Sequence, residues 1–146
     1  MPAPVDEPRM LERAMAVAAA AHEGQTDKNG RPKLDHCRRV AARVEGCRAK
    51  AVAWLHDVVE KSGDWSTHRL AAEGFDAEMV SAVDAMTRRR GEDYFDFARR
   101  AASHPLARWV KRADLEDNSQ QSVDAGQDAS RYEDALTLLK REGLLP

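Results

Sequence analysis

Apolar residues recur at spacings of three and four along most of the 146-residue chain, which is the pattern of amphipathic helices. Asp6 precedes the first such segment and is expected to cap a helix that tolerates Pro8 in its first turn and runs to about Glu23. The same pattern, with its capping and glycine signals, predicts further helices. These cover about residues 36–45, 48–60, 67–73, 77–86, 92–102, 106–118 and 129–141. The chain is therefore predicted to be all-α.

Two polar segments interrupt this pattern and are predicted to be loops. Residues 25–35 contain an Asn-Gly pair but no alternating strands beside it, so a polar loop with a little extended structure is expected. Residues 119–127 form the second predicted loop. No internal repeat or linker composition is visible, and residues 1–146 are expected to form one domain.

Composition supports helices over sheets, because aromatic residues make up only 5% of the chain and strands are enriched in them. The formal net charge is -2, whereas general nucleic-acid binders are usually basic, so no nucleic-acid partner is expected. No secretory signal is visible, and the apolar stretch at residues 14–21 is too short to span a membrane. A cytoplasmic protein without a membrane partner is expected.

The most informative segment is residues 53–60, Ala-Trp-Leu-His-Asp-Val-Val-Glu, where polar groups interrupt an apolar helix. A buried carboxylate is costly unless it is paired or bound to a cation. His56 and Asp57 lie about 100° apart around a helix and can both reach one ion, and Glu60 projects over the same patch. The alternative is a histidine satisfied by hydrogen bonds beside an Asp–Glu pair on a solvated stripe. An isolated His-Asp pair favours that alternative.

Two further residues shift the balance toward a metal site. His36 stands at the predicted start of a helix after the polar loop, and Asp114 is followed by Asn118 one turn later on the same face. With His56 and Asp57 they supply two imidazoles and two carboxylates. Such a donor set suits manganese, iron or zinc and leaves positions open for water.

Five short motifs follow one another along the chain. They are Ala-His-x-Gly-Gln, a basic loop leading to a histidine, Leu-His-Asp-x-x-Glu, Thr-Arg and Lys-x-Ala-Asp-x-x-x-Asn, at residues 21–25, 28–36, 55–60, 86–89 and 111–118. In this order they resemble the HD superfamily of metal-dependent phosphohydrolases. The closer resemblance is to the hydrolase domain of RelA/SpoT-type alarmone enzymes and their small single-domain relatives, and it covers about residues 10–120.

The resemblance implies a helical bundle around a central metal cleft. His36, His56, Asp57 and Asp114 would be the four protein ligands of one divalent metal ion, with Mn²⁺ the usual metal. The implied activity is hydrolysis of a small phosphorylated nucleotide, with guanosine 3′,5′-bis(diphosphate), ppGpp, as the first candidate and pyrophosphate as a product.

The resemblance also implies roles around the metal. Glu60 matches a residue beside the attacking water, and Asn118 matches one near the sugar or the leaving group. Lys28 matches a loop lysine that contacts substrate. Arg31 and Arg88 are expected to join it in offsetting phosphate charge.

Three positions depart from the alarmone-hydrolase pattern. Lys61 follows Glu60 where an aspartate is usual, Asp27 precedes Lys28 where an arginine is usual, and Lys33 follows the loop proline where a tyrosine is common. The predicted metal site is therefore complete, while its substrate surroundings are altered. An HD hydrolase of another nucleotide or phosphate ester stays open. So do a non-catalytic HD module that binds metal or nucleotide, and a helical interaction protein.

Overall fold

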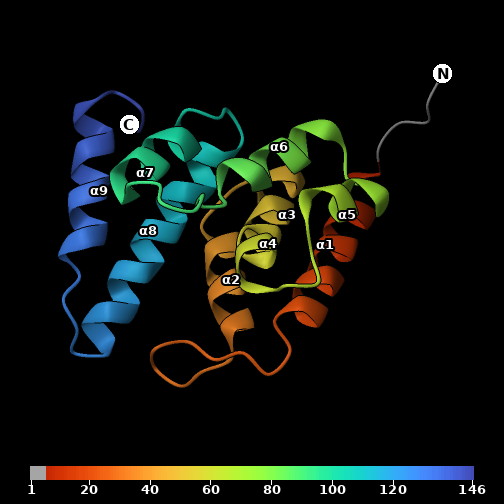
Figure 1. Ribbon diagram of the computed structural model, residues 1–146, viewed down its shortest axis with the longest axis horizontal. Coiled ribbons are helices and arrows are strands. Elements are labelled where there is room, and N and C mark those ends of the chain that lie inside the picture. Colours follow the sequence, from red (N-terminus) through yellow and green to blue (C-terminus); the bar gives the residue numbers. More distant parts are fainter. Residues whose placement is uncertain (1–5) are drawn as a thin grey trace.

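The computed structural model describes residues 6–146, and within them the chain forms nine helices and no strand (Figure 1). The all-α prediction is confirmed. Residues 1–5, which belong to the segment where no secretory signal was predicted, lie outside the described residues. None of the described helices is both long and apolar enough to cross a membrane. The helices are α1 (Glu7–Ala21), α2 (Lys33–Ala42), α3 (Cys47–Leu55), α4 (Val58–Lys61), α5 (Thr67–Ala72), α6 (Ala77–Ala85), α7 (Tyr94–Ala102), α8 (Ala107–Asp124) and α9 (Ser130–Arg141).

Aspartate and serine caps decide where several helices begin. The Asp6 carboxylate accepts a hydrogen bond from the backbone N–H of Arg9, and Ser66 and Asp76 cap α5 and α6 in the same way. Each cap satisfies an N–H that has no partner within its helix, which typically contributes about 1 kcal/mol. Asp93 caps α7. The predicted helix starts at Asp6, Ser66 and Asp76 are confirmed.

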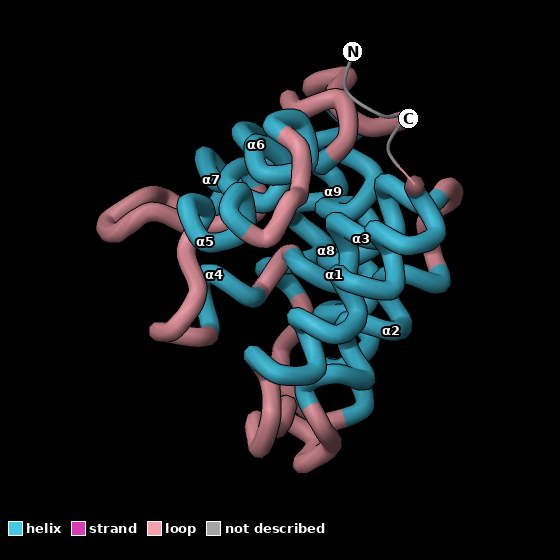
Figure 2. The backbone as a smooth tube through the Cα atoms, turned by 90° about the vertical axis from the view of Figure 1, so that its right-hand side faces the viewer, coloured by secondary structure: helices cyan, strands magenta, loops and turns pink. Residues whose placement is uncertain are grey.

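The helices pack around two clusters of buried apolar side chains, both of which include residues of α8. The larger cluster fills the space between α1, α2, α3 and α6, and the smaller one joins α7, α8 and α9 (Figures 1 and 2). Ala14, Ala18 and Ala51 of the larger cluster are fully buried, so small side chains let these helices approach closely. In the smaller cluster Leu115 and Leu139 are fully buried, and each such burial contributes about 1.5–3 kcal/mol. α8 therefore links the two clusters.

The helix predicted over residues 48–60 is wrong in one respect, because it is interrupted at His56 and Asp57. α3 ends one residue before His56, and α4 begins one residue after Asp57. The His56 Nδ1 lies 2.6 Å from the carbonyl oxygen of Ala53. In a continuous helix that oxygen would accept the N–H of Asp57. The His-Asp pair therefore stands on a bend between two helices rather than on a helix surface.

The predicted loop over residues 119–127 is wrong as far as Asp124, because α8 continues through it. Gln120 donates to Asp124 along the helix at 2.9 Å. Gln121 and Ser122 are buried. These residues are polar because they face other polar groups inside the protein, and polarity alone does not indicate a loop.

The predicted polar loop over residues 25–35 is confirmed in its first part and wrong in its last. Thr26 and Pro32 form an isolated antiparallel bridge, which is the small amount of extended structure expected. α2 begins at Lys33, directly after the proline, whereas the prediction began it at His36. Lys33 and His36 therefore lie one turn apart on the same side of α2.

Candidate metal centre and adjoining pocket

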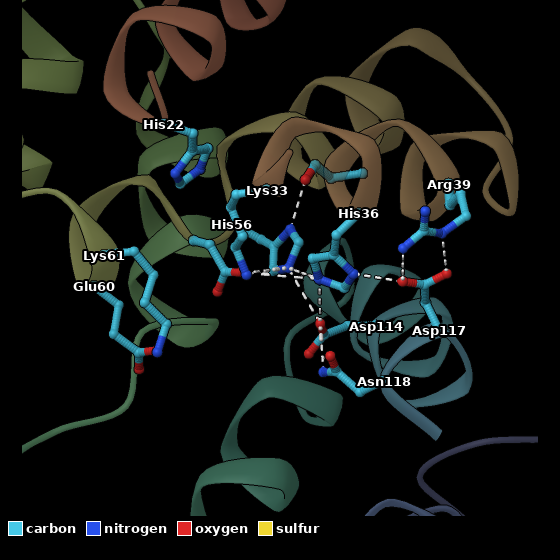
Figure 3. A network of polar contacts seen from close by, with 12 residues as sticks. His22, Lys33, His36, Arg39, His56, Glu60, Lys61, Asp114, Asp117 and Asn118 are labelled. Atoms are coloured by element: carbon cyan, nitrogen blue, oxygen red, sulfur yellow. Dashed lines mark hydrogen bonds and ion pairs between the residues drawn. The ribbon is translucent and has the colours of Figure 1, made fainter. Parts of the chain in front are cut away.

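Four side chains from three separate segments of the chain meet between α2, the bend after α3, and α8. Figure 3 shows three of them, His36, His56 and Asp114, pointing toward one another. The Nε2 atoms of His36 and His56 are 3.2 Å apart, and Oδ1 of Asp114 lies 3.1 and 3.2 Å from them. Oδ2 of Asp57 lies 3.7 Å from Nε2 of His36 and 3.3 Å from Nε2 of His56. The fold thus brings together all four residues that the sequence proposed as ligands.

Both imidazoles have an acceptor at Nδ1, which leaves Nε2 to face the centre. The Nδ1 of His36 is 2.6 Å from Oδ2 of Asp117, and the Nδ1 of His56 is 2.6 Å from the Ala53 carbonyl oxygen. A neutral imidazole carries one hydrogen, and such an acceptor holds it on Nδ1. With that tautomer, the Nε2 lone pairs face two carboxylate oxygens, and this arrangement is favourable only when a proton or a metal cation lies between them. The donor set fits a divalent transition metal.

Burial and neighbouring charges set the protonation of these groups. Burial alone raises the pKa of Asp57, but His56 and Lys33 oppose it, so this pKa lies well below its usual range. The pKa of Asp114 is also well below its usual range, because Lys111 and the histidines outweigh burial. Burial lowers the pKa of His56, but the two carboxylates raise it well above its usual value. Both carboxyl groups are therefore ionised at neutral pH, as metal ligands must be.

Asp117 is a residue of the site that the sequence reasoning missed. It is 2% exposed and holds the Nδ1 of His36. The Arg39 guanidinium donates to its two oxygens at 2.7 and 3.2 Å, and the Gln121 amide donates at 2.9 Å. Burial opposes ionisation of Asp117, but these hydrogen bonds prevail and hold its pKa below its usual range. Its spacing of three residues from Asp114, which places both on one helix face, is the signal that could have found it.

A lysine lies against each of the two proposed ligand carboxylates. The Nζ of Lys33 is 2.7 Å from Oδ2 of Asp57, the same oxygen that faces the histidines. The Nζ of Lys111 is 3.4 Å from Oδ2 of Asp114 and 4.0 Å from the centroid of the Phe97 ring. Burial lowers the pKa of Lys33, but Asp57 more than offsets this, and the pKa of Lys33 is raised. Both ligand carboxylates thus have a protein cation beside them.

The two predicted catalytic residues stand in different relations to the centre. Asn118 contacts it directly, since its amide nitrogen donates to Oδ1 of Asp114 at 3.1 Å. Glu60 lies to the left of the imidazoles in Figure 3, beside Lys61. One Glu60 oxygen accepts the backbone N–H of Arg88 at 3.0 Å, and the other lies 3.2 Å from the Nζ of Lys61. Glu60 is therefore held to one side of the centre by two partners of its own.

A pocket of about 480 Å³ adjoins the centre. Lys28, Lys33 and Lys61 line it together with Asn118, so three ammonium groups border one cavity. A larger hollow of about 620 Å³ lies elsewhere on the molecule and contains none of the predicted site residues. The lysine-lined pocket is the one that can bring an anionic ligand to the proposed metal ligands.

Two predicted substrate-binding residues do not line this pocket. Arg31 is exposed on the loop before α2, and only its backbone is hydrogen-bonded, to Asp27. Arg88 is also exposed, and its Nε donates to the Glu92 carbonyl oxygen at 3.0 Å. The guanidinium carbon of Arg88 lies 5.6 Å from the centre of the Tyr94 ring. The fold therefore brings Lys28, but neither arginine, to the pocket lining.

No protein-family model matches the sequence, and a comparison with curated proteins finds no match. The fold, in contrast, is similar to the solved structure of a metazoan ortholog of SpoT, a protein that hydrolyses ppGpp and plays a role in starvation responses. The alignment covers 99% of this chain and 100% of that chain, with a TM-score of 0.68 and 21% sequence identity. This chain therefore shares the all-helical fold of the SpoT ortholog, in agreement with the resemblance noted from the motifs.

Proposed function

We propose that this chain is a metal-dependent phosphohydrolase that acts on a phosphorylated nucleotide, with ppGpp as the first candidate substrate and Mn²⁺ as the metal. The observation that carries the proposal is the convergence of two Nδ1-tethered imidazoles and two ionised carboxylates beside a pocket with three lysines. The fold shared with a ppGpp-hydrolysing SpoT ortholog supports this choice of substrate.

In this proposal His36, His56, Asp57 and Asp114 hold the metal ion. Two imidazole nitrogens and two carboxylate oxygens leave positions for water and for a substrate oxygen. When bound, the metal supplies a water of lowered pKa and polarises a phosphoryl oxygen.

The reaction on ppGpp forms a bond from the water oxygen to the phosphorus attached to the ribose O3′. The bond between that phosphorus and O3′ breaks, which releases pyrophosphate and guanosine 5′-diphosphate. Glu60 takes the proton lost by the water, and the leaving O3′ takes a proton from solvent water that enters through the pocket. Asn118, which already donates to Asp114, orients the sugar or the leaving group.

The pocket lysines bind the phosphate groups of the substrate. Lys28 is positioned for this role, because its Nζ donates to the Ser122 hydroxyl at 2.8 Å and lies 5.0 Å from the centre of the Tyr132 ring. Positive charge placed beforehand at the phosphate site stabilises charge that develops in the transition state. Arg31 and Arg88 remain predicted contacts for parts of the substrate that extend beyond the pocket.

One observation favours a second candidate, a non-catalytic module that binds metal or nucleotide. Lys61 neutralises Glu60 at 3.2 Å, and the family pattern has an aspartate at the Lys61 position. Both Glu60 oxygens thus already contact donors of the protein, which suits binding without turnover. Glu60→Gln separates the two candidates. An enzyme loses turnover and keeps its metal, whereas a binding module has no turnover to lose and keeps its affinity for nucleotide.

The primary experiment measures Mn²⁺-dependent release of pyrophosphate or phosphate from a nucleotide panel that includes ppGpp. Asp57→Ala is the negative control, because it removes a metal ligand. Pyrophosphate release from ppGpp that the variant lacks supports the alarmone hydrolase. Hydrolysis of another nucleotide that is lost in Asp57→Ala would support a metal-dependent phosphohydrolase with a substrate other than ppGpp. Absence of turnover across the panel, with metal bound, favours the binding module.

A further inference from the structure

One oxygen atom of the centre already has a cation of the protein as its partner. The Nζ of Lys33 lies 2.7 Å from Oδ2 of Asp57, and both side chains are largely buried, at 17% and 13% exposure. The same Oδ2 is the Asp57 atom that faces the Nε2 atoms of His36 and His56. In the metal site proposed above, the ammonium and the metal ion therefore claim one ligand atom.

We propose that Lys33 is a displaceable cation that couples metal binding to substrate binding. Without metal it holds Asp57. When a divalent ion binds, the ammonium leaves Oδ2 and enters the adjoining pocket, where it binds a phosphate group of the substrate. This inference rests on the proposed function, since it takes the same residues as the metal ligands.

Electrostatics gives the reason for the displacement. An ammonium and a divalent ion on one carboxylate oxygen repel strongly, because solvent screens them poorly at a partly buried site. A lysine ammonium can be displaced at little cost, since it lies at the end of a flexible four-carbon side chain. Lys33 is the first residue of α2, so its side chain can move while the helix that carries His36 stays in place.

The pocket gives the ammonium a destination. Lys33 lines the cavity of about 480 Å³ together with Lys28 and Lys61. Lys111, the other lysine on a ligand carboxylate, provides the contrast. It is 1% exposed, is packed against Phe97 and does not line the pocket. Of the two lysines, only Lys33 both contacts a proposed metal ligand and lines the pocket in which an anion would bind.

Thermodynamic linkage then makes the coupling reciprocal. An anion in the pocket draws Lys33 away from Asp57 and tightens metal binding. A bound metal frees the ammonium and tightens anion binding. Removal of the lysine charge removes both the competition with the metal and this part of the coupling.

The test is calorimetric titration of Mn²⁺ into the wild-type protein and the variants Lys33→Met, Lys33→Arg and Lys61→Met, with circular dichroism to confirm that each is folded. We expect Lys33→Met to bind Mn²⁺ on the order of tenfold more tightly. Lys33→Arg keeps the charge and is expected to bind at least as weakly as the wild type. Lys61→Met removes the same charge from the same pocket without touching a ligand atom, and its affinity should change by less than about twofold.

A second titration adds inorganic phosphate as the probe anion. Phosphate should tighten Mn²⁺ binding to the wild-type protein about fivefold more than to Lys33→Met. Unchanged or weaker Mn²⁺ binding by Lys33→Met overturns the inference, as does an equal gain in Lys61→Met or an equal effect of phosphate on both proteins. In those cases Mn²⁺ still binds and the proposed function stands. Failure of the wild-type protein to bind any divalent ion removes both proposals.

Discussion

Two regions of the molecule are dense in charged side chains. They differ in how deeply these side chains are buried and in the direction in which their polar atoms point. On the surface, Arg48 pairs with Asp76 at 2.7 Å and with Glu78 at 3.0 Å, and these side chains are 27–54% exposed. At the centre, Asp57 and Asp114 are 13% and 9% exposed. Contact lengths are similar in both regions, so they do not distinguish a functional site from a structural ion pair.

The direction of the polar atoms does distinguish them. Each oxygen that contacts Arg48 faces a guanidinium N–H, so the surface group is complete and simply links α3 to α6. At the centre, the Nδ1 atoms of both imidazoles contact acceptors on Asp117 and Ala53, and their Nε2 atoms face the carboxylate oxygens of Asp57 and Asp114. Buried nitrogen and oxygen ligand atoms that converge on one point favour the binding of a cation. Four predictions test this contrast, from the largest expected effect to the smallest.

The largest effect on stability should come from the metal itself. Mn²⁺ at a hundred times its dissociation constant should raise the free energy of unfolding by about 2.7 kcal/mol, because it binds the folded state alone. Differential scanning calorimetry with Mn²⁺, and again after addition of a chelator, measures the shift. Asp57→Asn should abolish it. A wild-type melting temperature that changes with neither Mn²⁺ nor chelator would show that the centre does not bind the metal.

The next largest effect is expected for Asp117, which contacts the Nδ1 of His36 and none of the other proposed ligands. Asp117→Asn weakens the acceptor that orients His36 and should lower Mn²⁺ affinity by about 10- to 100-fold. Isothermal titration calorimetry gives the affinity. Asp124→Asn is the matched control, since Asp124 is an exposed aspartate of the same helix. Equal affinities in the two variants would mean that Asp117 serves packing only.

A smaller effect is expected at Glu92, whose carboxylate pairs with Arg100 at 2.9 Å in a partly buried ion pair away from the centre. The Arg100 hydrogen bonds lower the pKa of Glu92 from 4.5 to about 2. A depressed carboxyl pKa stabilises the fold above pH 4.5, and this contribution is lost as the pH falls toward 2. Glu92→Gln should therefore cost about 1 kcal/mol at pH 7, a value reduced by solvent screening.

Urea unfolding at pH 7 and at pH 3 measures this contribution. The difference between the wild type and Glu92→Gln should shrink at the lower pH, and Mn²⁺ affinity at pH 7 should be the same in both proteins. A difference that stays constant with pH would mean that the ion pair contributes through packing rather than charge.

The smallest effect should come from Arg48. Arg48→Ala is expected to lower the free energy of unfolding by about 0.5 kcal/mol, because exposed ion pairs contribute little. High salt should reduce the difference from the wild type, since it screens exposed charges. Chemical denaturation at two salt concentrations checks both points. Altered Mn²⁺ binding in this variant would contradict the separation of the two regions.

Local signals in the sequence determined most of the helices. The capping side chains of Asp6, Ser66 and Asp76 act within three residues of themselves, so their effect is readable without the fold. Apolar spacing located the buried faces for the same reason. The four proposed ligands were identified because their residue types and order match a known motif, and the fold then brought one oxygen of each aspartate within 3.7 Å of the Nε2 atoms of both histidines.

Tertiary structure alone decided the features that depend on partners far along the chain. The continuation of α8 could not be predicted, because Gln121 is polar in order to reach Asp117 and His36, which lies 85 residues earlier. The contact of Lys33 with Asp57, and the position of Arg31 outside the pocket, depend on how the loop lies over the bend after α3. Periodicity and capping are short-range properties of the chain, whereas a metal centre and its charge balance are made by packing.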